Sequence, residues 1–145
     1  MVYTELTKMA MIICLEAHRG QFDKGGYPYC FHPIHLAEQM DDEDSTCVAL
    51  LHDVIEDNPS YSLAYMGSTA MMPPAVVEAL RLLTHDKDNV SYEDYLKGIK
   101  SNKLATKVKL ADLRHNLDAS RLPKGKANPN QAKYEFALSY LLGVK

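Results

Sequence analysis

A histidine and an aspartate stand side by side in the most apolar segment of this 145-residue chain. His52 and Asp53 follow a run of small and aliphatic residues, 47–51, which predicts a helix that is buried nearly all round. An unpaired carboxylate would be costly there, so we expect a compensating positive charge. Asp112 is a second acid in an apolar stripe, and His32 stands at a predicted loop-to-helix junction. We therefore predict that one divalent cation is bound by His32, His52, Asp53 and Asp112.

Two imidazoles and two carboxylates form a nitrogen and oxygen ligand set that balances a charge of +2. Without a thiolate, this set suits manganese, iron, magnesium or zinc, and we favour Mn²⁺ because it takes several ligands. Four protein ligands leave room on such an ion for water and for a phosphate oxygen. A cation so placed lowers the pKa of bound water and polarises a phosphoryl group, which indicates a metal-dependent phosphohydrolase.

Two further acids follow the histidine and aspartate pair. Glu56 comes four residues after His52, and Asp57 comes four residues after Asp53, so on a helix each lies one turn further along the same face. There they could activate a metal-bound water and then protonate the leaving group, which makes both of them candidate catalytic residues. The alternative is an ordinary C-terminal helix turn that ends in solvent, where acids are tolerated.

Apolar residues recur at three- and four-residue steps through most of the chain, which predicts an all-α, single-domain bundle. The stretch 61–72 has no assigned structure, and 123–130 is predicted to be a polar loop. The first expected helix ends near Gly20, and a short second helix is opened by Pro33. The central helix is capped by Ser45 or Thr46 and continues through Ile55. Four further helices are expected to begin at Pro73, at Ser91, at about Lys103 and at Pro129.

The composition narrows the classes of function. A hydrophobic fraction of 46% and a charged fraction of 24% are those of an ordinary globular protein. A net charge of −3 gives no basic surface, so a nucleic-acid polymer is not an expected partner. We find no signal peptide and no apolar run of the ~18–20 residues that a membrane span needs, and we expect a cytoplasmic protein. An odd number of cysteines without a CxxC pair argues against disulfides, and we expect all three to be buried, namely Cys14, Cys30 and Cys47.

Four short segments together resemble the HD hydrolase domain of the RelA/SpoT-type alarmone enzymes. They are AHRGQ at 17–21, PYCFHP at 28–33, LLHDVIED at 50–57 and VKLADLRHN at 108–116. The resemblance covers roughly residues 4–120. It is closest to the small, stand-alone hydrolases of this family, which are similar to metazoan SpoT homologs in lacking a synthetase domain. It implies an HD phosphohydrolase domain over residues 1–145.

The resemblance also implies an activity and roles for individual residues. The activity is hydrolysis of the 3′-pyrophosphate of ppGpp, which gives GDP and pyrophosphate, with Mn²⁺ as the cofactor. Glu56 and Asp57 would activate the water. Lys24 would contact the nucleotide, Asn116 would contact the ribose, and Thr84 lies in the motif that would contribute to substrate binding.

The recognition segments depart from the family's usual pattern. The motif at Thr84 reads LTHDKD where LTK is commoner, and the last motif reads ADLRHN instead of ADRLHN, which displaces Arg114 by one position. Two alternatives therefore stay open. One is an HD phosphohydrolase for another phosphorylated nucleotide, such as a 3′-phosphate or a 5′-monophosphate. The other is a catalytically silent domain that binds a nucleotide and regulates a partner.

Several polar residues near these motifs are expected to support the site. We predict a hydrogen-bonded structural role for His18, a loop-tethering role for Gln21 and a packing or supporting role for His115. Positive charge near an anionic ligand could come from Arg19, Lys107 and Lys109.

Overall fold

The structure is a computed structural model that describes residues 1–144. Within this range every regular element is helical, and Phe22 and Pro28 pair in an isolated β-bridge. The predicted all-α bundle of the HD type is confirmed. The elements are α1 (Glu5–Ala17), α2 (Phe31–Glu38), α3 (Glu43–Leu51), α4 (Val54–Asp57), α5 (Leu63–Ser68), α6 (Pro74–Leu83), α7 (Tyr92–Lys100), α8 (Lys103–Asn116), the 3-10 turn η1 (Ala119–Arg121) and α9 (Gln131–Leu142).

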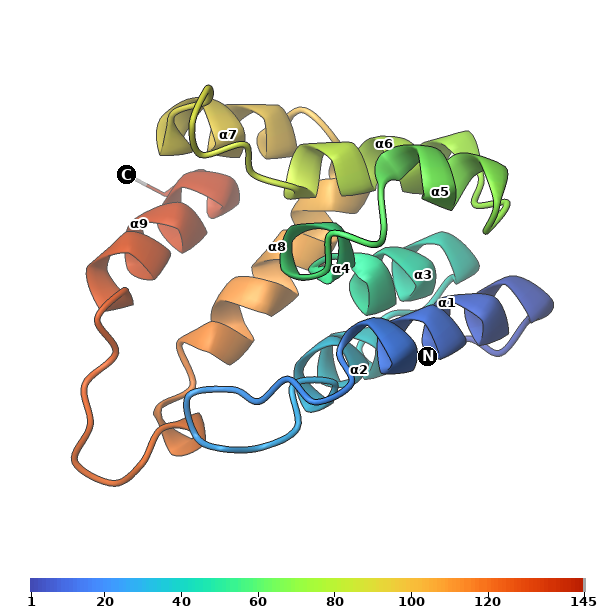
Figure 1. Cartoon of the computed structure of the whole chain (residues 1–145). Helices are drawn as coiled ribbons and strands as arrows, with labels where there is room; N and C mark the ends of the chain where they lie inside the picture. Colours follow the sequence, from blue (N-terminus) through green and yellow to red (C-terminus); the bar gives the residue numbers. More distant parts are fainter. Residues whose placement is uncertain (145) are drawn as a thin grey trace.

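The central helix of the bundle is α3. Every residue from Ser45 to Leu51 is buried, because small and aliphatic side chains cover all sides of this helix. It packs against α1, α2, α6 and α8. Figure 1 shows α1 and α2 on one side of α3 and the α5–α7 group on the other, with α8 running between them. These four neighbours enclose α3 and make it the centre of the core.

That C-terminal end departs from the prediction of one continuous helix. The helix stops at Leu51, His52 and Asp53 form a turn, and α4 is a separate short helix. On a continuous helix, adjacent side chains would point about 100° apart. The turn instead brings His52 Nε2 within 3.0 Å of Asp53 Oδ2. Two neighbouring residues thus reach the same point where the central helix ends.

Three helix starts also differ from the prediction. Asp42 caps α3 by accepting the Ser45 N–H at 2.7 Å, so the predicted caps lie inside the helix. A carboxylate is a strong N-cap, which explains the earlier start. The unassigned stretch 61–72 contains α5, whose first turn is capped by Ser62. The helices predicted to open at Pro33 and Pro129 begin at Phe31 and at Gln131.

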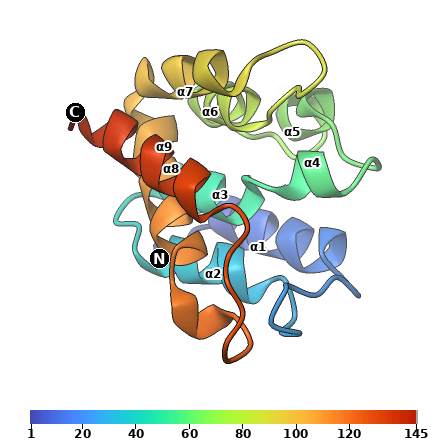
Figure 2. The ribbon, with the colours of Figure 1, turned by 90° about the vertical axis from the view of Figure 1, so that its left-hand side faces the viewer.

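Two polar segments far apart in the sequence lie side by side at one end of the bundle (Figures 1 and 2). They are the loop 18–30 and the segment 117–130. Arg121 comes within 3.7 Å of the Asp23 carboxylate. A Cβ atom on Gly25 would lie 2.3 Å from the Arg121 carbonyl oxygen, so only glycine fits this approach. Figure 2 also shows α9 lying across α8, as their contacts require.

None of the helices within residues 1–144 combines the length and the apolar character that crossing a bilayer would require.

The three cysteines do not share one environment, although all were predicted to be buried. Cys14 and Cys47 are fully buried, and burial raises the pKa of each thiol to about 12. Cys30, at the start of α2, is only half-buried. Two thiols are therefore protected and one is accessible.

We expect a thiol reagent at pH 8 to modify Cys30 rapidly and the other two cysteines only after unfolding. At that pH about one buried thiol in 10⁴ is ionised, and the thiolate is the reactive form. Counting modified thiols with and without urea checks this, and Cys30→Ser should remove the fast reaction. Rapid modification of all three thiols in the native protein would contradict the burial described here.

Candidate metal centre

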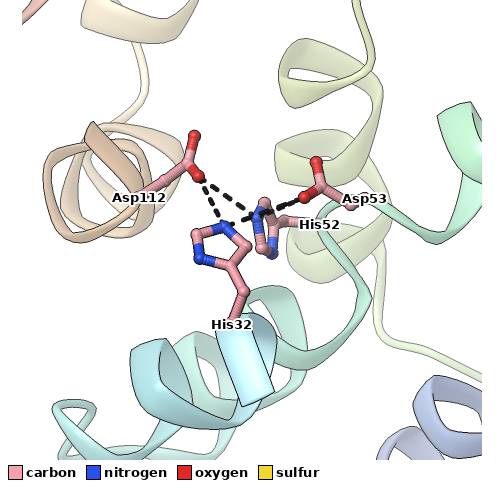
Figure 3. Close-up of side chains that lie close together, drawn as sticks. All are labelled: His32, His52, Asp53 and Asp112. Carbon is pink, nitrogen blue, oxygen red and sulfur yellow. Dashed lines mark hydrogen bonds and ion pairs between the residues drawn. The ribbon is translucent and has the colours of Figure 1, made fainter. Parts of the chain in front are cut away.

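The four predicted ligands come together at one point, although they lie on separate elements. Figure 3 shows their side chains converging. His32 Nε2 lies 2.8 Å from Asp112 Oδ1 and 3.8 Å from Asp53 Oδ2. His52 Nε2 lies 3.0 Å from Asp53 Oδ2 and 3.5 Å from Asp112 Oδ1. One ligand atom from each residue lies within 4.8 Å of all the others, so the group could hold a single metal ion.

The surroundings of this cluster explain why it attracts positive charge. His32, His52 and Asp112 are almost completely buried, with 2–4% of each residue exposed. Burial by itself would lower the pKa of His52, but the carboxylates of Asp53 and Asp112 raise it well above the usual value. Two buried carboxylates therefore favour a cation between them strongly enough to overcome desolvation.

The hydrogen bonds of His52 fit a metal ligand. Its Nδ1 lies 2.7 Å from the Ala49 carbonyl oxygen, which can only accept, so Nδ1 carries the proton. Nε2 is then the nitrogen that faces the two carboxylates, where a bound cation would replace its proton, and this buried atom has no hydrogen-bond partner among the described residues. An orphaned nitrogen that faces two carboxylates is the arrangement that a divalent cation would complete.

Each of the other ligands is also held by a partner outside the cluster. His32 Nδ1 lies 2.7 Å from Nδ1 of His115. Burial, together with the charge of Arg121, lowers the pKa of His115 to about 3, so this ring is neutral and one of the two facing Nδ1 atoms donates while the other accepts. The Tyr29 hydroxyl donates to Asp53 Oδ2 at 2.6 Å. The supporting role predicted for His115 thus has a specific partner.

Asp112 is paired with a buried cation, Lys109, one turn earlier on α8. Lys109 Nζ lies 2.8 Å from Asp112 Oδ2, and only 13% of the lysine side chain is exposed. Burial would raise the pKa of Asp112, but the Lys109 ammonium and the two imidazoles together lower it well below the usual value. The Asn116 amide donates to Asp112 Oδ1 at 3.0 Å. Asp112 is therefore ionised and fixed in orientation.

A cavity of about 350 Å³ lies against the cluster, and Asp53 and Asp112 form part of its wall. Its volume is that of a small-molecule site. Its wall is formed by residues of the loop 18–30, the segment 117–130, α9, α7 and the loop that precedes α7. The cavity thus connects the buried cluster to solvent.

Both candidate catalytic acids line this cavity, on α4. Glu56 accepts a hydrogen bond from the His85 main-chain N–H, and Asp57 accepts one from the Gln21 side-chain amide at 3.0 Å. Burial raises the pKa of both carboxyls above the ordinary range. The prediction placed both acids on a continuation of the central helix. They share the cavity with the cluster instead because α4 follows directly after the turn at residues 52–53.

The three predicted substrate contacts have different outcomes. Lys24 and Asn116 line the cavity. Asn116 already uses its amide oxygen to accept from Arg121, at 3.1 Å. Thr84 is not among the cavity-lining residues, and its hydroxyl donates to the Leu80 carbonyl of its own helix at 2.8 Å. The structure therefore gives no support to the prediction for Thr84, whose neighbour His85 lines the wall instead.

Part of the cavity wall comes from residues that no sequence motif indicated. Of the cations proposed to balance an anionic ligand, Lys109 lines the cavity, whereas Lys107 pairs with Asp41 on another surface and Arg19 is exposed elsewhere. Other cavity-lining cations come from loops and from α9, namely Lys87, Arg121 and Lys133. Lys133 Nζ lies 4.5 Å from the centre of the Tyr92 ring, which also lines the cavity. Nothing in the local sequence distinguishes these residues from solvated ones.

Fold and site together define a helical domain of the HD type with a buried histidine and aspartate cluster that could hold a metal. No family model matches the chain. The chain is 33% identical over 121 residues to a protein of Escherichia coli named bifunctional (p)ppGpp synthase/hydrolase SpoT. It is 32% identical over 117 residues to the guanosine-3′,5′-bis(diphosphate) 3′-pyrophosphohydrolase of Haemophilus influenzae. Over these segments the chain is related to the RelA/SpoT-type hydrolases.

These alignments cover 76% and 73% of this chain but only 17% of each relative. The chain therefore spans about a sixth of the length of the curated relatives it matches. The relationship agrees with the resemblance predicted from the four motifs, at the level of the family.

The buried pair of Lys109 and Asp112 predicts a large effect on stability. We expect Lys109→Met to lower the free energy of unfolding of the metal-free protein by about 3 kcal/mol at pH 7, because it leaves a buried carboxylate without its cation. The loss should shrink below about pH 4, since Asp112, whose folded pKa is lowered, stabilises the fold only where the unfolded carboxyl is ionised. Urea unfolding in EDTA at several pH values checks this.

Lys107→Met is the matched control, two residues away on the same helix. Lys107 also forms ion pairs, with Asp41 and Asp42, but 40% of its side chain is exposed. Its removal should cost less than about 1 kcal/mol. Equal losses for the two variants would contradict the burial and pairing described for Lys109.

Proposed function

We propose that this chain is a metal-dependent phosphohydrolase that hydrolyses guanosine-3′,5′-bis(diphosphate) to GDP and pyrophosphate. We propose further that residues 1–145 form one HD phosphohydrolase domain with Mn²⁺ as the preferred cofactor. The convergence of four ligand atoms within 4.8 Å at the base of a cavity carries this proposal. The names of the related proteins supply the substrate.

We assign His32, His52, Asp53 and Asp112 as the metal ligands. The outer partners described above hold these side chains in place, so little reorganisation would accompany binding. When bound, the ion would supply a positive charge that lowers the pKa of water and polarises the phosphoryl group. The low accessibility of the cluster leaves the cavity side as the direction from which substrate approaches.

We assign proton transfer to Glu56 and Asp57. Both carboxyls have a raised pKa, which brings them closer to neutral pH, where a group can take and return a proton. Neither is a member of the four-residue cluster, so both remain available to water and to the leaving group. Balanced chemistry requires one proton to leave the attacking water and one to reach the departing oxygen.

We assign substrate contacts to Lys24 and Asn116, which line the cavity. Phosphates would otherwise meet the acids Asp53, Glu56 and Asp57, so cations in the wall are needed. We leave Thr84 without a role in binding. The finer likeness to stand-alone hydrolases and a cytoplasmic location remain predictions.

The direct test is incubation of the purified chain with ppGpp and Mn²⁺, followed by identification of the products. GDP and pyrophosphate in equal amounts are expected. A parallel panel of 3′-phosphorylated nucleosides and 5′-monophosphates tests the first alternative. Turnover of those compounds without pyrophosphate from ppGpp would replace the proposed substrate, and binding without any turnover would favour the silent regulatory domain.

The ligand assignment predicts loss of metal in Asp53→Ala. We expect the wild-type chain to retain one Mn²⁺ after desalting, and the variant to retain almost none and to lose activity with it, since a carboxylate at the centre of the cluster is removed. Elemental analysis and Mn²⁺ electron paramagnetic resonance measure the binding. Asp41→Ala, an exposed aspartate outside the cluster, is the control. Full occupancy in Asp53→Ala would refute the assignment.

The assignment of Glu56 predicts a different result. Glu56→Gln should keep the metal but lower kcat by ~10²–10⁴-fold, the usual effect of losing a general acid or base. Metal content and steady-state rates are measured on the same sample. Glu78→Gln, an exposed glutamate paired with Arg81, should behave as wild type. A normal rate for Glu56→Gln would show that the proton moves through another group.

A further inference from the structure

The segment AHRGQ at 17–21 supplies no ligand to the cluster, yet its residues bond to the end of α4. It forms the C-terminal end of α1 and the turn after it. The Ala17 carbonyl oxygen accepts a hydrogen bond from Asn58, the C-cap residue of α4, at 3.1 Å. The helix that carries the two candidate catalytic acids is thus attached to α1 at its C-terminal end.

A second connection joins side chains. His18 is buried, and its Nδ1 lies 2.8 Å from Gln21 Oε1. An amide oxygen can only accept, so His18 Nδ1 carries the proton and donates. The Gln21 amide nitrogen in turn donates to Asp57 Oδ2 at 3.0 Å. A buried N–H therefore determines which end of the Gln21 amide faces Asp57.

The backbone around Gln21 is equally constrained. Gly20 adopts a φ of +77°, a conformation that favours glycine, and it turns the chain back toward α1. The Gln21 N–H donates to the His18 carbonyl at 3.0 Å, and the Gln21 carbonyl accepts from the Tyr29 N–H at 2.8 Å. The side-chain amide thus extends from a backbone position fixed on both sides.

We propose that His18 and Gln21 are positioning residues that hold one oxygen of the Asp57 carboxylate and leave the other free for the cavity. Oδ1 of Asp57 takes part in no hydrogen bond of the described residues, whereas Oδ2 is held by Gln21. Gln21 itself does not line the cavity. Its effect on the reaction therefore passes through Asp57, and this consequence rests on the proposed function.

The charged groups around Asp57 explain why such a donor matters. Burial and the negative charge of Asp53 raise the pKa of Asp57, while the Gln21 hydrogen bond and the nearby rings of His18 and His52 lower it. Gln21 is the uncharged donor in this set, so its removal changes the hydrogen bond without changing the net charge. Substitution of Gln21 can thus test how the orientation of the Asp57 carboxylate affects the reaction, separately from any change in charge.

The test replaces Gln21 with methionine, which keeps the length of the side chain and removes the donor. Carboxyl ¹³C NMR of the full chain should show the pKa of Asp57 rising by roughly half to one unit, the usual effect of one hydrogen bond. With ppGpp and Mn²⁺, the acid limb of the kcat profile should move to higher pH by a similar amount, with KM unchanged.

Gln131→Met is the matched control, because Gln131 also donates its amide to a carboxylate, that of Glu135, but on an exposed surface of α9. It should leave the pKa of Asp57 and the pH profile as in wild type. His18→Asn keeps an N–H at the place of Nδ1 and should preserve both values, whereas His18→Leu removes it and should reproduce the effect of Gln21→Met.

The outcomes separate the two proposals. An unchanged pKa of Asp57 in Gln21→Met overturns the positioning role, and so does a His18→Leu variant that folds and behaves as wild type. If the wild-type chain does not hydrolyse ppGpp but the pKa of Asp57 still moves as expected, the positioning role is upheld and the proposed function fails.

Discussion

Two carboxylates at the meeting point of apolar helices, Asp112 buried and Asp53 half-buried, are the constraint on which the rest of this structure depends. Asp53 and Asp112 lie at the C-terminal end of the most buried helix, where unpaired negative charge would oppose folding. The fold compensates with Lys109 and with two imidazoles, and it leaves one buried nitrogen of His52 without a partner. The same arrangement that compensates the negative charge of the cluster also allows it to bind a divalent cation.

The groups around the cluster show how a small bundle can hold four side chains in fixed directions. Each is held by a partner outside the cluster: a carbonyl for His52, a ring for His32, a hydroxyl for Asp53 and an ammonium for Asp112. These contacts come from α3, α8 and the loop before α2. The helical core therefore determines the distances between the four clustered side chains, while the loops contribute much of the cavity wall and its charge.

The short helix α4 connects the buried cluster to the open cavity. Because the chain turns at residues 52–53, the acids that follow lie on a separate element, held by the loop after α1 and by the segment after α6. Helix ends and loops are the places where such a pair can be adjusted without disturbing the core. This division explains why the segment 17–21 is part of the site although it contributes no ligand.

The sequence by itself determined the all-helical class, the apolar character of the central helix and the identity of the four clustered residues, because burial of an acid in an apolar run needs compensation wherever it occurs. It left open that α3 ends before His52, that Asp42 caps it, and that 61–72 contains a helix, since several neighbouring residues could begin or end each of these helices and the sequence does not choose among them. Only the tertiary structure decided that Tyr29, Arg121 and Lys133 line the cavity and that Thr84 does not. Their positions follow from the packing of α8, α9 and two distant loops, and no spacing along the chain encodes such contacts.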